Sequence, residues 1–177
     1  MSSKPRQQSS RSRPQPRATV SDAEIQSVLA TLAGTPKEIA RIASGRTASQ
    51  LHRKPAADAW SAQEILAHVR ACAEVWGRSI SRMLAEDRPT IRYVSPRGWI
   101  KKTDYLQQDF RETLRKFSEQ RAGLVTRLRK LPAGGWTRSA TFTGTTSGRD
   151  GTVLSYANRI AEHEVRHLDQ LRRTLTS

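Results

Sequence analysis

The chain has 177 residues, a net charge of +15 and one cysteine, and 36% of its residues are apolar. The length favours a single domain with one hydrophobic core, while the lone cysteine excludes an internal disulfide framework and is typical of a reducing compartment. No segment approaches the roughly 20 apolar residues of a membrane span and no apolar signal segment follows the basic N-terminus, so we expect a cytoplasmic protein with no membrane partner.

Residues 1–18 differ in composition from the rest of the chain. They contain no acidic residue, almost nothing apolar, and five basic residues: Lys4, Arg6, Arg11, Arg13 and Arg17. Such a segment cannot bury enough surface to offset the entropy lost on ordering. We therefore predict a disordered basic tail over residues 1–18 and one folded domain over residues 19–177. The tail is either simply solvated or binds nucleic acid weakly and without sequence preference.

The first predicted helix covers residues 22–43, where apolar residues recur at helical spacing. The sequence GTP at 34–36 is expected to interrupt or kink this helix, and Gly45 predicts its end. Residues 47–51 follow as one short helical turn.

Two further helices have clear boundaries in the sequence. Ser61 and Glu64 have the spacing of a capping box, and the helix that they begin should run to about Glu86. A proline-containing connection over residues 87–102 separates it from the next helix. In that third helix, apolar residues recur at helical spacing from 106 to 128.

The segment before the last helix is predicted to be a long loop. Residues 132–151 are rich in Gly, Thr and Ser, and the strand-like sequence SATFT at 139–143 cannot form a sheet by itself. Loops of this length are often functional. Thr152 should cap a final helix that continues through Leu171. The four long amphipathic helices predict an all-α four-helix bundle with a long loop before its last helix.

Three of the four histidines lie where they could share a metal ion. His163 and His167 are four residues apart, so they project from one face of the last helix. His68 lies at the edge of the apolar stripe of the second helix, as His163 does on its own helix. If the two helices pack side by side, three imidazoles converge and leave an open position, as in catalytic metal sites. Spacing alone leaves open the alternative of exposed or merely packed histidines, and His52 is predicted to be a surface residue.

The segment AEHEVRH at 161–167 contains the H-E-x-x-H pattern of zinc peptidases. A zincin peptidase needs a third ligand after the second histidine, but no His or Glu follows His167, and Asp169 should point away from the pair. No convincing sheet edge is available to bind an extended peptide. We therefore predict that the pattern is accidental and that the protein is not a zincin peptidase. Glu164 is expected on the apolar side, either as a partner of the ligands or as a partly buried structural acid.

Two more residues are candidates for supporting the three histidines. Cys72 lies four residues after His68 and points nearer to the core. A buried inert thiol is the simpler interpretation, and a fourth metal ligand is the alternative. Tyr156 on the last helix is the other candidate.

Two segments together resemble the DinB-like superfamily. AWSAQEILAHVRACAEVW (59–76) carries its W-S-x-x-E-x-L-x-H pattern, and TVLSYANRIAEHEVRHLDQL (152–171) carries its H-x-x-x-H pair. The resemblance covers roughly residues 22–175. It implies a four-helix bundle that holds a divalent metal on three histidines, which are His68, His163 and His167 in this chain. Zinc, nickel and iron all accept imidazole, so the sequence does not choose among them.

The resemblance leaves three functions open. Family members include transferases that join low-molecular-weight thiols to electrophiles, metal-dependent hydrolases, and proteins of no known activity. Our leading hypothesis is a metal-dependent thiol S-transferase with a small-molecule substrate. The second is a hydrolase that activates water at the metal, and the third is a non-enzymatic stress or nucleic-acid-associated protein. A homodimer is also left open.

Overall fold

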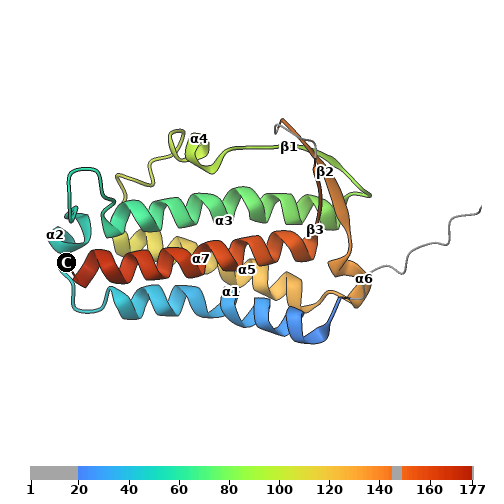
Figure 1. Cartoon of the computed structure of the whole chain (residues 1–177), viewed down its shortest axis with the longest axis horizontal. Helices are drawn as coiled ribbons and strands as arrows, with labels where there is room; N and C mark the ends of the chain where they lie inside the picture. The colour runs from blue at the N-terminus through green and yellow to red at the C-terminus, as the bar shows by residue number, and fades with distance from the viewer. Residues whose placement is uncertain (1–19, 145–148, 177) are drawn as a thin grey trace, which may run out of the picture.

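Four long helices lie side by side along most of the molecule (Figure 1). The computed structural model describes residues 20–144 and 149–176, so the tail predicted for residues 1–18 lies outside the described residues. The elements follow in this order: α1 (Asp22–Ile42), α2 (Ala48–His52), α3 (Ala62–Ala85), β1 (Thr90–Arg92), α4 (Pro96–Ile100), α5 (Phe110–Arg129), α6 (Ala133–Trp136), β2 (Ser139–Thr143), β3 (Arg149–Thr152) and α7 (Val153–Thr176).

Helices α1, α3, α5 and α7 form the four-helix bundle that the sequence predicts. Both α1 and α3 pack against α5 and against α7, so each of the four has two neighbours in the bundle. Their apolar faces meet in the interior, where Leu32, Ile80, Phe117 and Ile160 are almost completely buried. None of the helices in the described part of the chain is long and apolar enough to cross a membrane.

Local capping explains where three of these helices begin. The Ser61 hydroxyl accepts from the Glu64 amide at 3.2 Å and the Glu64 carboxylate accepts from the Ser61 amide at 2.8 Å, which confirms the predicted capping box of α3. The Thr152 hydroxyl likewise accepts from the Ser155 amide at 3.1 Å and caps α7. Ser21 caps α1 through the Glu24 amide.

Helix α1 continues through Pro36, so the interruption expected at residues 34–36 does not occur. A proline removes one backbone hydrogen bond from a helix. The residues on both sides of Pro36 nevertheless bury apolar side chains, with Leu32 at 0% and Ile39 at 3% exposure. Tertiary packing therefore holds one continuous helix across the proline.

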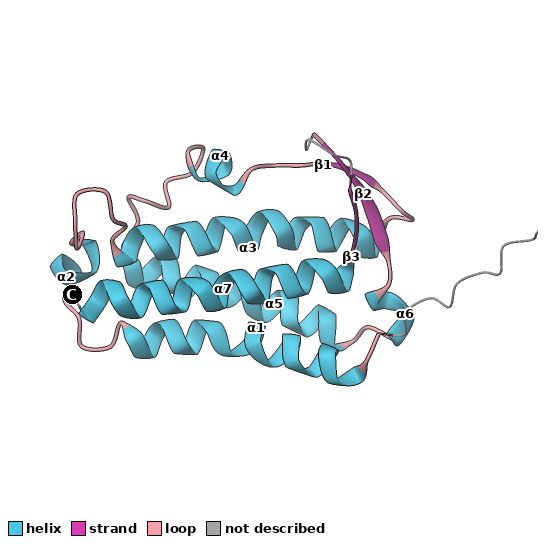
Figure 2. Ribbon diagram, in the orientation of Figure 1, coloured by secondary structure: helices cyan, strands magenta, loops and turns pink. Residues whose placement is uncertain are grey.

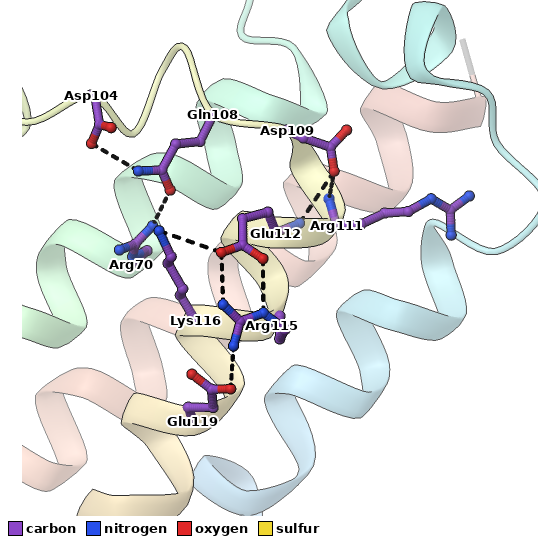
Figure 3. Close-up of polar contacts among 9 residues, drawn as sticks. All are labelled: Arg70, Asp104, Gln108, Asp109, Arg111, Glu112, Arg115, Lys116 and Glu119. Carbon is purple, nitrogen blue, oxygen red and sulfur yellow. Dashed lines mark hydrogen bonds and ion pairs between the residues drawn. The ribbon is translucent and has the colours of Figure 1, made fainter.

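Helix α5 begins four residues later than its apolar periodicity suggested. The Asp109 carboxylate accepts from the backbone amides of Arg111 and Glu112 at 2.8 and 3.2 Å, so the helix starts at Phe110 (Figure 3). Leu106 lies outside the helix and is 40% exposed. The prediction of a helix from residue 106 was therefore wrong at its start, because a side-chain cap, and not the apolar pattern, determines the boundary.

A small three-stranded sheet covers the end of the bundle where α7 begins (Figure 2). Strand β2 pairs in parallel with β1 and antiparallel with β3. The expectation that SATFT forms no sheet was wrong, since its parallel partner is β1, a strand of three residues about fifty positions upstream. Phe142 of β2 turns toward the bundle and stacks on Tyr156, with ring centroids 4.5 Å apart. Gly151 lies so close to this pair that a Cβ atom would come within 2.7 Å of the Tyr156 ring.

Candidate metal centre

The three histidines named from the sequence come from the two neighbouring helices α3 and α7. These helices run in opposite directions and lie side by side (Figure 1). His68 lies in the second turn of α3, and His163 and His167 lie one turn apart near the middle of α7. Ile65, three residues before His68, and Ile160, three residues before His163, are 2% and 1% exposed, so both apolar stripes face the core. All three imidazoles therefore lie where α3 and α7 meet.

The imidazole nitrogens converge on one point. Nε2 of His163 lies 3.2 Å from Nε2 of His68 and 3.1 Å from Nε2 of His167. The three ligand atoms all lie within 4.8 Å of one another. Ligands held tetrahedrally around zinc at roughly 2.0–2.1 Å lie about 3.3 Å apart, so the spacing fits a shared cation. We call His68, His163 and His167 the three-histidine group.

Two residues that the sequence reasoning missed orient this group. The Oε1 atom of Gln170 lies 2.8 Å from Nδ1 of His167. Because a carbonyl oxygen only accepts, Nδ1–H donates to it, and the lone pair of Nε2 stays available for a metal. The Trp60 ring stacks in parallel on His167 at 6.2 Å and contacts the edge of His68 at 5.1 Å. Gln170 lies three residues after His167 on the same helix, and this spacing is the feature of the sequence that could have identified it.

Partial burial keeps the three imidazoles neutral, which is the state that binds metals. Burial, together with the smaller effect of neighbouring histidines and arginines, lowers the pKa of His68 to about 4 and that of His163 to about 3. Burial also lowers the pKa of His167, although its contact with Gln170 opposes the shift. At neutral pH each imidazole is therefore uncharged and has one unprotonated ring nitrogen that can bind a cation.

Cys72 lies directly beside the three-histidine group. Its Sγ atom is 3.5 Å from Nε2 of His68 and 3.7 Å from Nε2 of His163. The side chain is 2% exposed, and burial raises the pKa of the thiol to about 12. The sulfur does not belong to the set of ligand atoms that all lie within 4.8 Å of one another. The buried position expected for Cys72 is therefore confirmed, and its sulfur lies beside the convergent nitrogens.

Glu164, the acid of the H-E-x-x-H pattern, faces the opposite way. Its carboxylate forms an ion pair with Arg121 of α5, and the two side chains are 1% and 2% exposed. Burial raises the pKa of Glu164 to about 7, and the adjacent guanidinium opposes this shift. Asp169 is exposed and pairs with Arg172. In the described part of the chain, the group that could hold a metal ion thus contains histidines and no carboxylate.

Tyr156 and His52 are not part of the three-histidine group. Tyr156 lies about two turns before His163 on α7 and packs against Phe142. Burial raises the pKa of its hydroxyl to about 12. His52 is exposed on α2, as predicted. Neither residue belongs to the cluster of potential ligands that the described residues form.

Two pockets lie on either side of His163 along α7. The first, which we call the His167 pocket, has a volume of about 470 Å³, and its lining includes Asp58, Trp60, Arg97, His167, Gln170 and Arg173. The second, the Tyr156 pocket, has a volume of about 270 Å³, and its lining includes Trp76, Ile91, Tyr93, Trp99, Phe142 and Tyr156. Trp76 links the second pocket to the group, because its ring contacts the edge of His163 at a centroid distance of 4.9 Å.

A bundle of four helices with three convergent histidines on two of them defines a class of potential metal-binding proteins. The model of the DinB superfamily matches residues 31–171, and the chain therefore belongs to this family. A search among proteins of curated function found no match. Among solved structures, that of YfiT from Bacillus subtilis is similar, with a TM-score of 0.72, 20% sequence identity, and coverage of 90% of this chain and 91% of that one. YfiT is described as a probable metal-dependent hydrolase with an unusual four-helix bundle topology.

Proposed function

We propose that His68, His163 and His167 hold a divalent metal ion and that the chain is a metal-dependent enzyme that transfers a low-molecular-weight thiol to an electrophile. The observation that carries this proposal is the convergence of three neutral imidazole nitrogens, with Nε2 atoms 3.1 and 3.2 Å apart. A divalent ion in such a site lowers the pKa of a thiol or water that binds to it. Zinc, nickel and iron all fit the donor set.

The two pockets favour a reaction between two partners over hydrolysis. The His167 pocket carries charged and polar groups, whereas the Tyr156 pocket is lined mainly by aromatic and aliphatic side chains. A polar thiol and an apolar electrophile could approach the three-histidine group from opposite ends of this seam. Hydrolysis would need a site for only one organic substrate.

The side chains of the chain itself would bind and orient the reactants. Gln170 would fix the tautomer of His167, and Trp60 packs against the rings of His167 and His68. Glu164 cannot serve as a general base for a group at the histidines while it is buried and paired with Arg121. The transferase proposal needs no such base, because the pKa of the thiol is lowered by the ion that it binds.

A metal-dependent hydrolase is the second candidate, and a specific observation favours it. The structurally similar YfiT is described as a probable hydrolase of this kind. In this case the three-histidine group would activate water, and one of the two pockets would hold the organic substrate.

An activity assay distinguishes the two candidates. The purified protein would be loaded separately with Zn²⁺, Ni²⁺ or Fe²⁺ and supplied with a panel of small thiols and a halobimane electrophile. The transferase proposal predicts turnover that requires both metal and thiol, is abolished by His68→Ala and is unchanged by His52→Ala. Hydrolysis of activated esters without any thiol, with no thiol transfer, would contradict it and support the hydrolase.

A further inference from the structure

The surroundings of the three-histidine group carry an excess of positive charge. Arg97 lines the same pocket as His167, Arg159 lies one helical turn before His163 on α7, and Arg166 directly precedes His167. None of these arginines forms an ion pair with an acidic side chain of the described residues. The guanidinium of Arg159 instead lies over the Trp76 ring at 4.8 Å.

One of these arginines is located in a concave site. Arg97 from α4 and His167 from α7 both line the His167 pocket, together with Arg173 and Gln170. Asp58 is the one acidic residue in the described lining. Arg97 is exposed to solvent and forms no hydrogen bond or ion pair with the other described residues. Its guanidinium is therefore available to a ligand that enters the pocket.

The donor set adds to this imbalance. Three neutral imidazoles contribute no negative charge, and the nearby acid Glu164 is already paired with Arg121. A divalent ion on the group would therefore place two uncompensated positive charges beside Arg97. A divalent ion held by partly buried side chains is stabilised by a negative charge nearby. A ligand with an oxyanion would supply the missing negative charge, because guanidinium binds carboxylate and phosphate through two parallel hydrogen bonds.

We propose that the His167 pocket binds an oxyanion, a carboxylate or a phosphate, of the small-molecule substrate, with Arg97 as its main contact. The inference rests on the proposed function, because it names the substrate class of the same site. The volume of about 470 Å³ suits a small organic acid and not a polymer. Trp60 lines the same pocket as Arg97 and His167, and its ring contacts the rings of His167 and His68.

The indole N–H of Trp60 can report on this binding directly. Its signal in ¹H–¹⁵N correlation spectra, assigned with Trp60→Phe, would be followed during titration with succinate, inorganic phosphate and neutral succinamide. Both metal-free and zinc-loaded protein would be used. We expect a saturable shift with succinate, phosphate or both, and none with succinamide. The Arg97→Gln variant should raise the dissociation constant about ten- to hundredfold, as expected for the loss of a charge-assisted hydrogen bond.

The control is Arg111→Gln on α5, which changes the net charge by the same amount. The Arg111 guanidinium points away from the other side chains drawn in Figure 3. Its substitution should leave the dissociation constant within about twofold of the unmodified protein, since exposed charges far from a site are screened. Equal affinity of Arg97→Gln and the unmodified protein, or an equal response to succinamide, would overturn the inference.

Metal analysis of the same samples separates the two proposals. A protein that binds zinc but shows no response of Trp60 to either oxyanion would refute the oxyanion site and leave the metal site intact. A metal-free protein that cannot take up zinc, yet binds succinate through Arg97, would refute the metal site and support the oxyanion site.

Discussion

Glu164 is adjacent in sequence to a proposed metal ligand, yet its carboxylate lies in the buried core. It pairs with Arg121 between α7 and α5, and both side chains are almost completely buried. Removing one partner of a buried ion pair leaves an uncompensated charge. We expect Glu164→Gln to lower the free energy of unfolding by about 3 kcal/mol while the metal content stays unchanged. Urea denaturation and metal analysis of the same variant would check both parts.

The companion variant removes both charges. Glu164→Leu combined with Arg121→Met should recover most of the lost stability, because neither charge then lacks a partner. A Glu164→Gln protein of normal stability that has lost metal, or that has lost peptide cleavage, would contradict this assignment. The latter result would restore the zincin interpretation of the H-E-x-x-H pattern.

The three imidazoles make the stability of the metal-free protein depend on pH. Burial lowers the pKa of His68 to about 4 and that of His163 to about 3, whereas an unfolded histidine has a pKa near 6.5. Between these values the unfolded chain binds more protons, so stability falls as the pH falls. We expect the urea midpoint of the metal-free protein to be highest above pH 6.5 and to decrease from pH 6.5 toward pH 4.

A variant isolates this contribution. The raised pKa of Glu164 acts in the opposite sense, because its folded form takes up a proton more readily. His163→Gln leaves Glu164 in place and removes one lowered imidazole. Its urea midpoint should therefore decrease less between pH 6.5 and pH 4 than that of the unmodified protein. A decrease that is equal or larger in His163→Gln would show that the imidazole is not the cause.

At the scale of elements, Glu74 of α3 holds the segment that contains α4 against α3. Its Oε2 atom accepts from the Trp99 indole at 3.0 Å and from the Tyr105 hydroxyl at 2.5 Å. The Glu74→Ala variant should loosen this segment, and with it the position of Arg97. We expect hydrogen exchange of the amides of residues 99–107 to become about tenfold faster, while α1 is unaffected.

Glu119→Ala provides the matched control for this prediction. Glu119 pairs with Arg115 on the exposed side of α5 and has a side-chain exposure of 63% (Figure 3). An exposed pair of this kind contributes little to stability, so exchange over residues 99–107 should not change. Exchange at normal rates in Glu74→Ala would show that other contacts hold the segment.

The helices could be predicted from the sequence because their signals are local. The capping box of Ser61 and Glu64 and the cap at Thr152 lie within four residues of the helices that they begin. The sheet could not be predicted in this way. Strand β2 depends on a parallel partner of three residues about fifty positions upstream, and no short-range pattern marks that pairing.

The same distinction applies to the candidate site. The spacing of His163 and His167, together with the resemblance at His68, was enough to predict which imidazoles converge. Arg97 was not predicted, because it belongs to a connection whose path across α3 depends on contacts such as those of Trp99. Local sequence thus predicts which histidines converge, and tertiary packing determines what surrounds them.

At the scale of the whole molecule, the three-histidine group brings together side chains of α3 and α7, which lie side by side in the bundle (Figure 1). One helix would supply a single ligand and the other two, so a bound ion would connect segments that are at least 95 residues apart. Ligands contributed by different elements make metal binding depend on the folded state. The metal content of the protein therefore tests the proposed site most directly.

The most direct measurement is elemental analysis of the purified protein after incubation with zinc and removal of free metal. We predict about one ion per chain for the unmodified protein and for His52→Ala, a sharp loss for His68→Ala, and almost none for the His163→Ala/His167→Ala double variant. Circular dichroism would verify that each variant is folded. A folded double variant that retains one ion per chain would contradict the account, because the metal would then lie away from these histidines.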